Sequence, residues 1–243
     1  MATADAGTTA RSLEVSSEEY VEVYDEPMHP TVLENEFVRV LKVNCPSHQD
    51  TMLHRHSQDS FFLFFRNAKI RNEVVGKDPF EAELQAGSFY WGDHMANPII
   101  HKVCVGRHDL DCMDVEIKAD RPRPTRNIGP ALPDTSKRHL SFENDVLRAY
   151  RATLLPGDNI DDIFAHHGGA DGEKRAGGDL NCLAVAMKSA KLSRGNIQAG
   201  DSWWCDGISE DVSAADGGDA HGGKSWSNVG DQEEAEIMIL QPK

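Results

Sequence analysis

The feature that most constrains the fold of this 243-residue chain is an internal repeat. Residues 33–41 read LENEFVRVL and residues 142–150 read FENDVLRAY, so each stretch places a Glu-Asn pair before an arginine at the same offset. Further pairs occur in the same order: residues 64–70 with 186–192, 84–91 with 197–204, and 114–117 with 235–239, the last two stretches each preceded by Val-Gly. Matches in one order predict two copies of a single structural unit. The matched arginines, Arg39 and Arg148, are expected to have a structural role.

The residue composition and pattern of each copy predict β-structure. The apolar runs are short, rich in β-branched and aromatic residues, and separated by Gly, Pro, Asn and Asp, which is typical of all-β sandwiches and barrels. A proline-rich stretch without apolar periodicity separates the copies and favours an extended linker. The expected organisation is a flexible leader (1–28), a first barrel (29–119), a linker (120–135) and a second barrel (136–243).

Charge and cysteine usage exclude several classes of function. The net charge of -15 repels nucleic acid and anionic lipid surfaces, so neither is an expected partner. No apolar run approaches the ~20 residues of a membrane span. The five cysteines are scattered and never form a C-x-x-C pair, which favours a reducing compartment. We expect a cytoplasmic protein, with an organelle as the alternative. Phosphate-loop, dinucleotide and nucleophile-elbow motifs are absent from the sequence.

Two histidines, His54 and His56, stand one residue apart just before the apolar run of residues 61–65. On a β-strand, side chains at i and i+2 point to the same face, so both imidazoles would project together. Imidazole is a ligand for several transition metals, and a third ligand from another strand would complete a site. The spacing alone fits equally well two rings that only make hydrogen bonds in the barrel.

Each half resembles a cupin domain, and the whole chain resembles a bicupin of the RmlC-like superfamily. The first cupin motif contains a His-x-His pair, which His54 and His56 match. The second motif is a glycine-led turn and strand followed by a histidine, which residues 87–91 and then His101 match. The resemblance implies two cupin barrels, of the double-stranded β-helix or jelly-roll type, in tandem. It covers most of the chain: residues 33–118 and 142–240.

The resemblance implies a metal ion held inside the first barrel by His54, His56 and His101. It also implies a glutamate ligand, which should fall at Ser60 or Phe61, and neither side chain can replace it. Three neutral ligands preserve the full charge of a divalent cation and leave positions open for oxygen or substrate. This pattern is known in cupins that use iron for dioxygenation. Fe(II) is therefore the expected metal, with zinc, nickel and manganese as alternatives.

The second half does not repeat this ligand set. The positions that correspond to the three histidines are Phe164 or Ala165, His166 or His167, and Ser225. His221, in a glycine-rich loop, is the alternative third ligand. We expect the second barrel to be a degenerate copy with a structural role or a role in forming a homodimer.

The expected function is that of a dioxygenase-type oxidoreductase that acts on a small organic molecule. One alternative is a metal-dependent lyase or isomerase, in which Asp59, Tyr90 or His94 would serve as the base. Another is a non-catalytic binding or storage module, and fold analogy cannot choose among the three. Asp59 stands one or two residues before the expected glutamate position, and we expect it to be a strand-start residue that satisfies a backbone donor rather than a metal ligand. The other loop histidines of the first half are expected to be solvated: His29, His48 and His108.

Overall fold

The computed structural model describes residues 19–121, 134–158, 181–192, 195–205 and 234–243. The chain divides into two compact units, Met1–Arg121 and Pro122–Lys243, and each is described by itself. The regular secondary structure of the described residues is almost entirely β-strand, which confirms the all-β prediction. No helix in this part of the chain has the length and apolar character that a membrane crossing requires. The first unit also carries one short 3-10 helix, η1 (Val23–Asp25).

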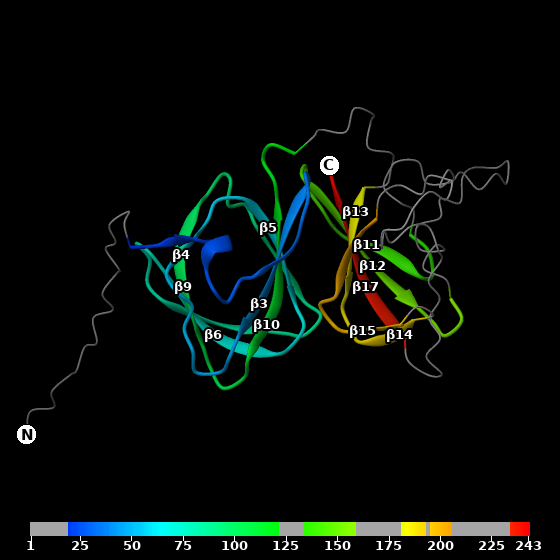
Figure 1. Cartoon of the computed structure of the whole chain (residues 1–243), viewed down its shortest axis with the longest axis horizontal. Helices are drawn as coiled ribbons and strands as arrows, with labels where there is room; N and C mark the ends of the chain where they lie inside the picture. The colour runs from blue at the N-terminus through cyan, green and yellow to red at the C-terminus, as the bar shows by residue number, and fades with distance from the viewer. Residues whose placement is uncertain (1–18, 122–133, 159–180, 193–194, 206–233) are drawn as a thin grey trace, which may run out of the picture. The chain divides into compact units, whose positions relative to one another are not determined.

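The first unit contains two five-stranded sheets that face each other (Figure 1). Apart from the consecutive pairs β2–β3 and β6–β7, neighbouring strands in each sheet are not consecutive in the chain, as in a jelly roll. In order across the first sheet, the strands are β1 (Val21–Glu22), β4 (His54–His56), β9 (Ile99–Val105), β6 (Ala68–Val74) and β7 (Phe80–Leu84). In order across the second sheet, they are β2 (Thr31–Glu34), β3 (Val38–Cys45), β10 (Leu110–Ile117), β5 (Asp59–Phe64) and β8 (Phe89–Gly92).

The interior of this barrel changes from apolar to polar along its strands. Side chains on one face of a strand are two residues apart. On β9 the inward face begins at Val105 in the apolar core and continues through Val103 to His101. On β10 it begins at Leu110 in the same core and reaches Asp114. The hydrophobic cluster therefore fills one end of the barrel and leaves the other end to polar side chains.

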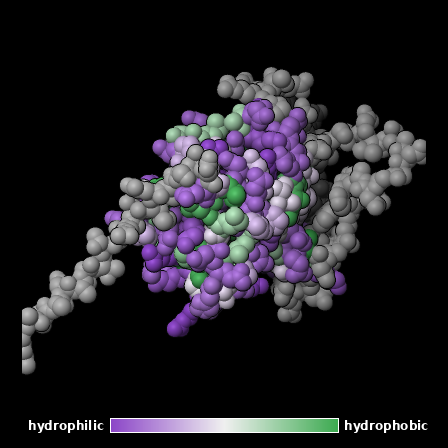
Figure 2. All heavy atoms as spheres, turned by 60° about the vertical axis from the view of Figure 1, so that its left-hand side comes forward, coloured by the Kyte–Doolittle hydropathy of each residue, from purple (hydrophilic) through white to green (hydrophobic). Residues whose placement is uncertain are grey.

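The outer surface of the molecule differs from the apolar core of the barrel. Figure 2 shows a largely hydrophilic face that carries a group of hydrophobic residues. The exposed large hydrophobic side chains among the described residues are Tyr24, Val32, Met52, Phe80, Tyr90, Met95 and Leu155.

The N-terminal segment corrects one predicted boundary, because residues 19–28 belong to the barrel and not to a flexible leader. β1 pairs in parallel with β4, where Val21 lies opposite His54. Glu22 forms an ion pair with Arg55 of β4, and Val23 is only 1% exposed. The acidic composition of this segment suggested a leader, but its valines pack and its acid has a partner. Residues 1–18 lie outside the described residues.

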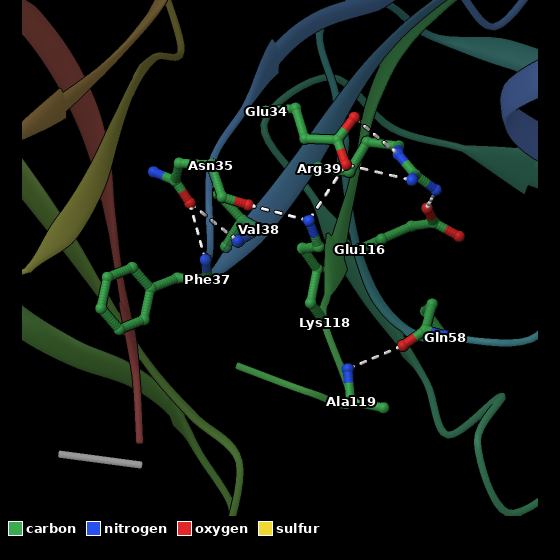
Figure 3. A network of polar contacts seen from close by, with 9 residues as sticks. All are labelled: Glu34, Asn35, Phe37, Val38, Arg39, Gln58, Glu116, Lys118 and Ala119. Carbon is green, nitrogen blue, oxygen red and sulfur yellow. Dashed lines mark hydrogen bonds and ion pairs between the residues drawn. The ribbon is translucent and has the colours of Figure 1, made fainter. Parts of the chain in front are cut away.

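The Glu-Asn motif of the repeat stabilises a turn between β2 and β3 (Figure 3). The Asn35 side-chain oxygen accepts hydrogen bonds from the backbone N–H groups of Phe37 and Val38, at 2.8 and 3.0 Å. The Arg39 guanidinium donates to Glu34 at 3.1 and 3.2 Å. Arg39 also forms a 3.0 Å ion pair with Glu116 of β10, and Lys118 reaches Glu34 at 3.1 Å.

The second unit repeats this turn. The Asn144 side-chain oxygen accepts hydrogen bonds from the backbone N–H groups of Val146 and Leu147, each at 2.8 Å. Arg148 donates to Glu143 at 2.8 Å, and Lys243 pairs with the same carboxylate. The repeated sequence motif is thus a turn and its ion pairs, which supports the structural role predicted for the two arginines.

One sheet of the second unit has the strand order of the β2-β3-β10-β5-β8 sheet in the first unit. In order across this sheet, the strands are β11 (Arg138–Glu143), β12 (Leu147–Leu154), β17 (Ala235–Pro242), β13 (Cys182–Ala186) and β16 (Ser202–Cys205). A further pair consists of β14 (Ala190–Leu192) and β15 (Gly195–Ile197). Residues 122–133 of the predicted linker lie outside the described residues, as do all the candidate ligand positions of the second half: Phe164, Ala165, His166, His167, His221 and Ser225.

The strand pairing in the two units shows that the predicted repeat match of residues 114–117 with 235–239 is out of register. Leu41 and Tyr150 each stand two residues after a matched arginine. Leu41 lies opposite Asp114 on β10, whereas Tyr150 lies opposite Ile239 on β17. Asp114 therefore corresponds to Ile239 and not to the start of the stretch at Ala235. By the same register, Glu116 opposite Arg39 corresponds to Gln241 opposite Arg148.

Candidate metal centre

The register of two neighbouring strands brings the three predicted histidines together. His54 on β4 lies directly opposite His101 on β9, and His56 is on the same face two residues later. One ring nitrogen of each residue lies within 4.8 Å of those of the other two. All three side chains are buried, at 0%, 1% and 8% exposure for His54, His56 and His101. Among the residues that the structure describes, this is the one cluster with the composition and spacing of a metal site.

For two of the three rings, a hydrogen bond on the far side selects the nitrogen that faces the cluster. Nδ1 of His54 lies 2.8 Å from the carbonyl oxygen of Met52, and Nδ1 of His101 lies 2.9 Å from the side-chain oxygen of Asn72. Because both partners are acceptors, each Nδ1 carries the hydrogen and each Nε2 keeps a lone pair. Both Nε2 atoms are buried and have no hydrogen-bond partner in the described part of the chain. Two oriented lone pairs are left for a cation.

Burial keeps these imidazoles neutral. Loss of solvation lowers the pKa of His54 to about 3, and the neighbouring His29 and His56 add to the effect. Burial likewise lowers the pKa of His101 well below its usual value, with His54 and His56 as further causes. Neutral imidazole is the form that binds metal, so these ligands need not lose a proton at neutral pH.

The residues present fit a divalent transition metal. Imidazole nitrogens lie about 2.1 Å from a bound ion such as zinc, and small side-chain rotations would bring atoms already within 4.8 Å of one another to that distance. Ser60, where the family glutamate was expected, is fully buried, and its hydroxyl donates to the carbonyl of Gln58 at 3.2 Å. The candidate ligand set therefore consists of three imidazole nitrogens, without the glutamate that was expected at Ser60.

The prediction that His29 is solvated is wrong. Its side chain is buried, and its ring centroid lies 4.7 Å from that of His54. Nδ1 of His29 forms a hydrogen bond with the Glu26 carboxylate, which is 2% exposed. Although burial opposes it, hydrogen bonds from His29, Met52 and Met28 lower the pKa of Glu26. Sequence reasoning missed this pair because it assigned residues 1–28 to a leader. His48 and His108 are exposed, as expected.

His94 lies beside the cluster. Its side chain is 5% exposed, and its ring centroid is 5.3 Å from that of His56. Burial, with a contribution from His56, lowers the pKa of His94. A Cβ atom at Gly92 would overlap with Nε2 of His94, so the glycine makes room for the ring. Of the three predicted candidate bases, this is the one buried next to the ligands.

Tyr90 occupies an outer position on the same side of the sheet. It pairs with Phe62 across β8 and β5, and their rings lie 5.9 Å apart. Phe62 in turn contacts His56 at 5.7 Å. Tyr90 is 57% exposed, and Phe62 is the residue whose ring contacts both Tyr90 and His56.

The structure does not place Asp59 at the cluster. Asp59 and Phe62 point to opposite faces of β5, because their separation is an odd number of residues. The Asp59 carboxylate accepts a 3.0 Å hydrogen bond from the backbone N–H of Met95. This confirms the alternative expectation that it satisfies a backbone donor, and it anchors the loop that carries His94.

A carboxylate that sequence reasoning did not consider lies at the cluster instead. Asp114 on β10 is fully buried, and its Oδ2 lies 3.3 Å from Nδ1 of His56. The signal was present in the strand, since 114 is an inward position of a run whose other buried residues are mostly apolar.

Two facing sheets, three histidines on adjacent strands and a second unit that repeats one of the sheets decide the fold. The chain has the fold of a bicupin. No protein-family model matches this sequence, and no curated protein matches it.

Solved structures similar to this chain include a cupin domain from Bordetella pertussis, which is 23% identical and covers 37% of this chain and 92% of its own, with a TM-score of 0.35. Oxalate decarboxylase from Bacillus subtilis is 9% identical over 85% of this chain and 69% of its own, with a TM-score of 0.48. Salicylate 1,2-dioxygenase from Pseudoaminobacter salicylatoxidans is 9% identical over 89% of this chain and 73% of its own, with a TM-score of 0.46. The likeness concerns the fold alone.

Proposed function

We propose that the first barrel binds one Fe(II) ion through His54, His56 and His101 and oxidises a small organic molecule with dioxygen. The observation that carries the proposal is the cluster of three buried histidines, two of which are kept neutral by burial and keep an unpartnered Nε2. A site with three neutral ligands retains the full charge of the cation and leaves coordination positions for other molecules.

When bound, iron would supply the one-electron chemistry through which dioxygen reacts with an organic molecule. The chain would hold the ion and keep the histidine rings oriented through Met52 and Asn72. Phe62, whose ring lies beside both His56 and Tyr90, would restrict the access of water to the ligands. Tyr90, which is exposed, would meet a substrate that enters from solvent.

A metal-dependent lyase or isomerase is the second candidate, and the position of His94 supports it. A buried ring whose pKa is lowered is neutral and can accept a proton from a substrate carbon. Its centroid lies 5.3 Å from that of His56, so a substrate bound to the cation would lie near it.

Oxygen uptake tests the choice between the two reactions. The protein reconstituted with Fe(II) is assayed with panels of thiols and catechols, and substrate loss is followed in parallel without oxygen. Oxygenase activity predicts uptake that stops in the His101→Ala variant and persists in His108→Ala, a control for an exposed histidine of the same unit. Substrate turnover without oxygen would instead support the lyase or isomerase. Metal binding without turnover of any compound would support a binding or storage module.

The compartment is part of the proposal. All five cysteines are free thiols, and Cys45 and Cys112 are buried. Free thiols are the usual state in the cytoplasm, where we place the protein. A measurement of thiol content in the freshly purified protein tests this assignment, and a disulfide would contradict it.

A further inference from the structure

Asp114 is a buried carboxylate that the fold leaves without a hydrogen bond. Its side chain is 0% exposed, and neither oxygen has a hydrogen-bond partner among residues in the described ranges. Its nearest cationic or imidazole group is Nδ1 of His56, 3.3 Å from Oδ2. This distance is just beyond the usual N–H···O range of about 2.7–3.2 Å, so a small movement would complete the bond. A buried carboxylate without a partner destabilises a fold, and its presence calls for a reason.

The sheet itself does not require a carboxylate at this position. The corresponding residue of the second unit is Ile239, which is fully buried in an apolar cluster. Asp114 lies between Leu41 and Phe62 in its ladder, and Ile239 lies between Tyr150 and Ala184 in the other. The same sheet geometry thus accepts an apolar side chain at this position.

The neighbouring buried acidic residue, Glu116, has a structural explanation. Glu116, two residues later on the same face of β10, forms a 3.0 Å ion pair with Arg39. Its counterpart by register is Gln241, which lies opposite Arg148. The turn network described above therefore accounts for Glu116 and leaves Asp114 unexplained.

We propose that Asp114 is a positioning residue of the metal centre. It accepts a hydrogen bond from Nδ1–H of His56, which turns Nε2 of that ring toward the cation, as Met52 and Asn72 do for His54 and His101. It also provides a carboxylate next to the cluster. The position at which the family glutamate was expected is occupied by Ser60 and provides none. The proposal rests on the three-histidine centre of the proposed function and deepens it. Carboxylates that hydrogen-bond ligand histidines in this way raise the basicity of the ring.

This role predicts opposite effects of one substitution on stability and on metal binding. Asp114→Ile introduces the side chain that the second unit carries, and Asp114→Asn removes the charge but keeps the shape. Without metal, both variants should melt at the same temperature as wild type or at a higher one, because an unsatisfied buried charge is gone. With metal, both should bind more weakly by roughly 10–100-fold, the usual effect of losing such a partner. A residue with only a structural role would change stability and affinity in the same direction.

The experiment measures Co²⁺ binding to the full-length chain by competition with a chromophoric chelator, together with the visible spectrum of the bound cobalt. Glu116→Gln is the matched control, since it removes a nearby buried acid and introduces the residue of the second unit. We expect weaker binding and a changed cobalt spectrum in Asp114→Asn and Asp114→Ile, and wild-type values in Glu116→Gln. If Asp114→Ile does not fold, Asp114→Asn decides the question.

Two results would overturn this inference. One is Co²⁺ affinity in the Asp114 variants within about threefold of wild type, well short of the usual loss. The other is an equal loss in Glu116→Gln. Neither result depends on oxygen uptake, so the oxygenase proposal could fail while the role of Asp114 stands. Wild-type protein that binds no Co²⁺ would refute both.

Discussion

Replacing His101 by alanine removes one ligand while leaving the apolar core of the barrel in place. The His101 side chain is 8% exposed, and its Nδ1 contacts the Asn72 side chain at 2.9 Å. In the metal-free protein the change leaves the Asn72 oxygen without this partner, at a cost of about 1–3 kcal/mol. We therefore expect His101→Ala to fold, with a moderately lower Tm.

The larger effect concerns the response to metal. A cation present at about 100 times its Kd stabilises the folded state by about 2.7 kcal/mol through mass action. For a protein of this length, each 1 kcal/mol moves Tm by about 2–4 °C, so saturating metal should raise the wild-type Tm by about 5–11 °C. With one of three ligands absent, the Kd of His101→Ala should rise far enough to abolish this shift.

Thermal unfolding with and without Zn²⁺ measures both quantities on the same samples. His108→Ala, which changes an exposed histidine of the same unit, should show the full wild-type shift. A metal-dependent shift of wild-type size in His101→Ala would refute the assignment of this residue as a ligand. Loss of the shift in His108→Ala would show that the response does not report the barrel interior.

Three further predictions test other parts of the account. Gly92→Ala should displace the His94 ring, because the new Cβ would overlap it, and should lower turnover while metal content stays unchanged. The pairing of Glu143 with Lys243 and Arg148 lowers the pKa of Glu143 to about 2. Since this pKa lies below the usual 4.5, the stabilisation from these ion pairs is present above pH 4.5 and is lost as pH falls toward 2. The difference in urea midpoint between wild type and Glu143→Gln should therefore shrink over this range. Removal of metal with a chelator should lower the wild-type Tm reversibly, and an unchanged Tm would contradict a bound ion.

The sequence was sufficient for the features that depend on local pattern. Alternation along a strand placed His54 and His56 on one face, and the β4–β9 register then confirmed His101 as their neighbour. The Glu-Asn repeat predicted two copies of one unit because both copies build the same turn around Asn35 and Asn144.

Features that depend on contacts between distant segments were missed. Glu26 and His29 reach the cluster only because β1 pairs with β4 and η1 follows it, and an acidic stretch gives no sign of such pairing. The match of residues 114–117 with 235–239 was out of register by an even number of residues. Such a shift cannot be seen in the sequence, because it preserves the inward and outward alternation of a strand. Only the ladder opposite Tyr150 reveals that Ile239 is the counterpart of Asp114.

Elemental analysis of the purified chain tests the central claim most directly. Protein prepared without added metal, or reconstituted with Fe(II) and desalted, should contain one divalent transition metal ion per chain. The triple variant His54→Ala, His56→Ala, His101→Ala should contain none. Wild-type protein that retains no metal after reconstitution, or a triple variant that retains the full amount, would contradict a metal centre in the first barrel.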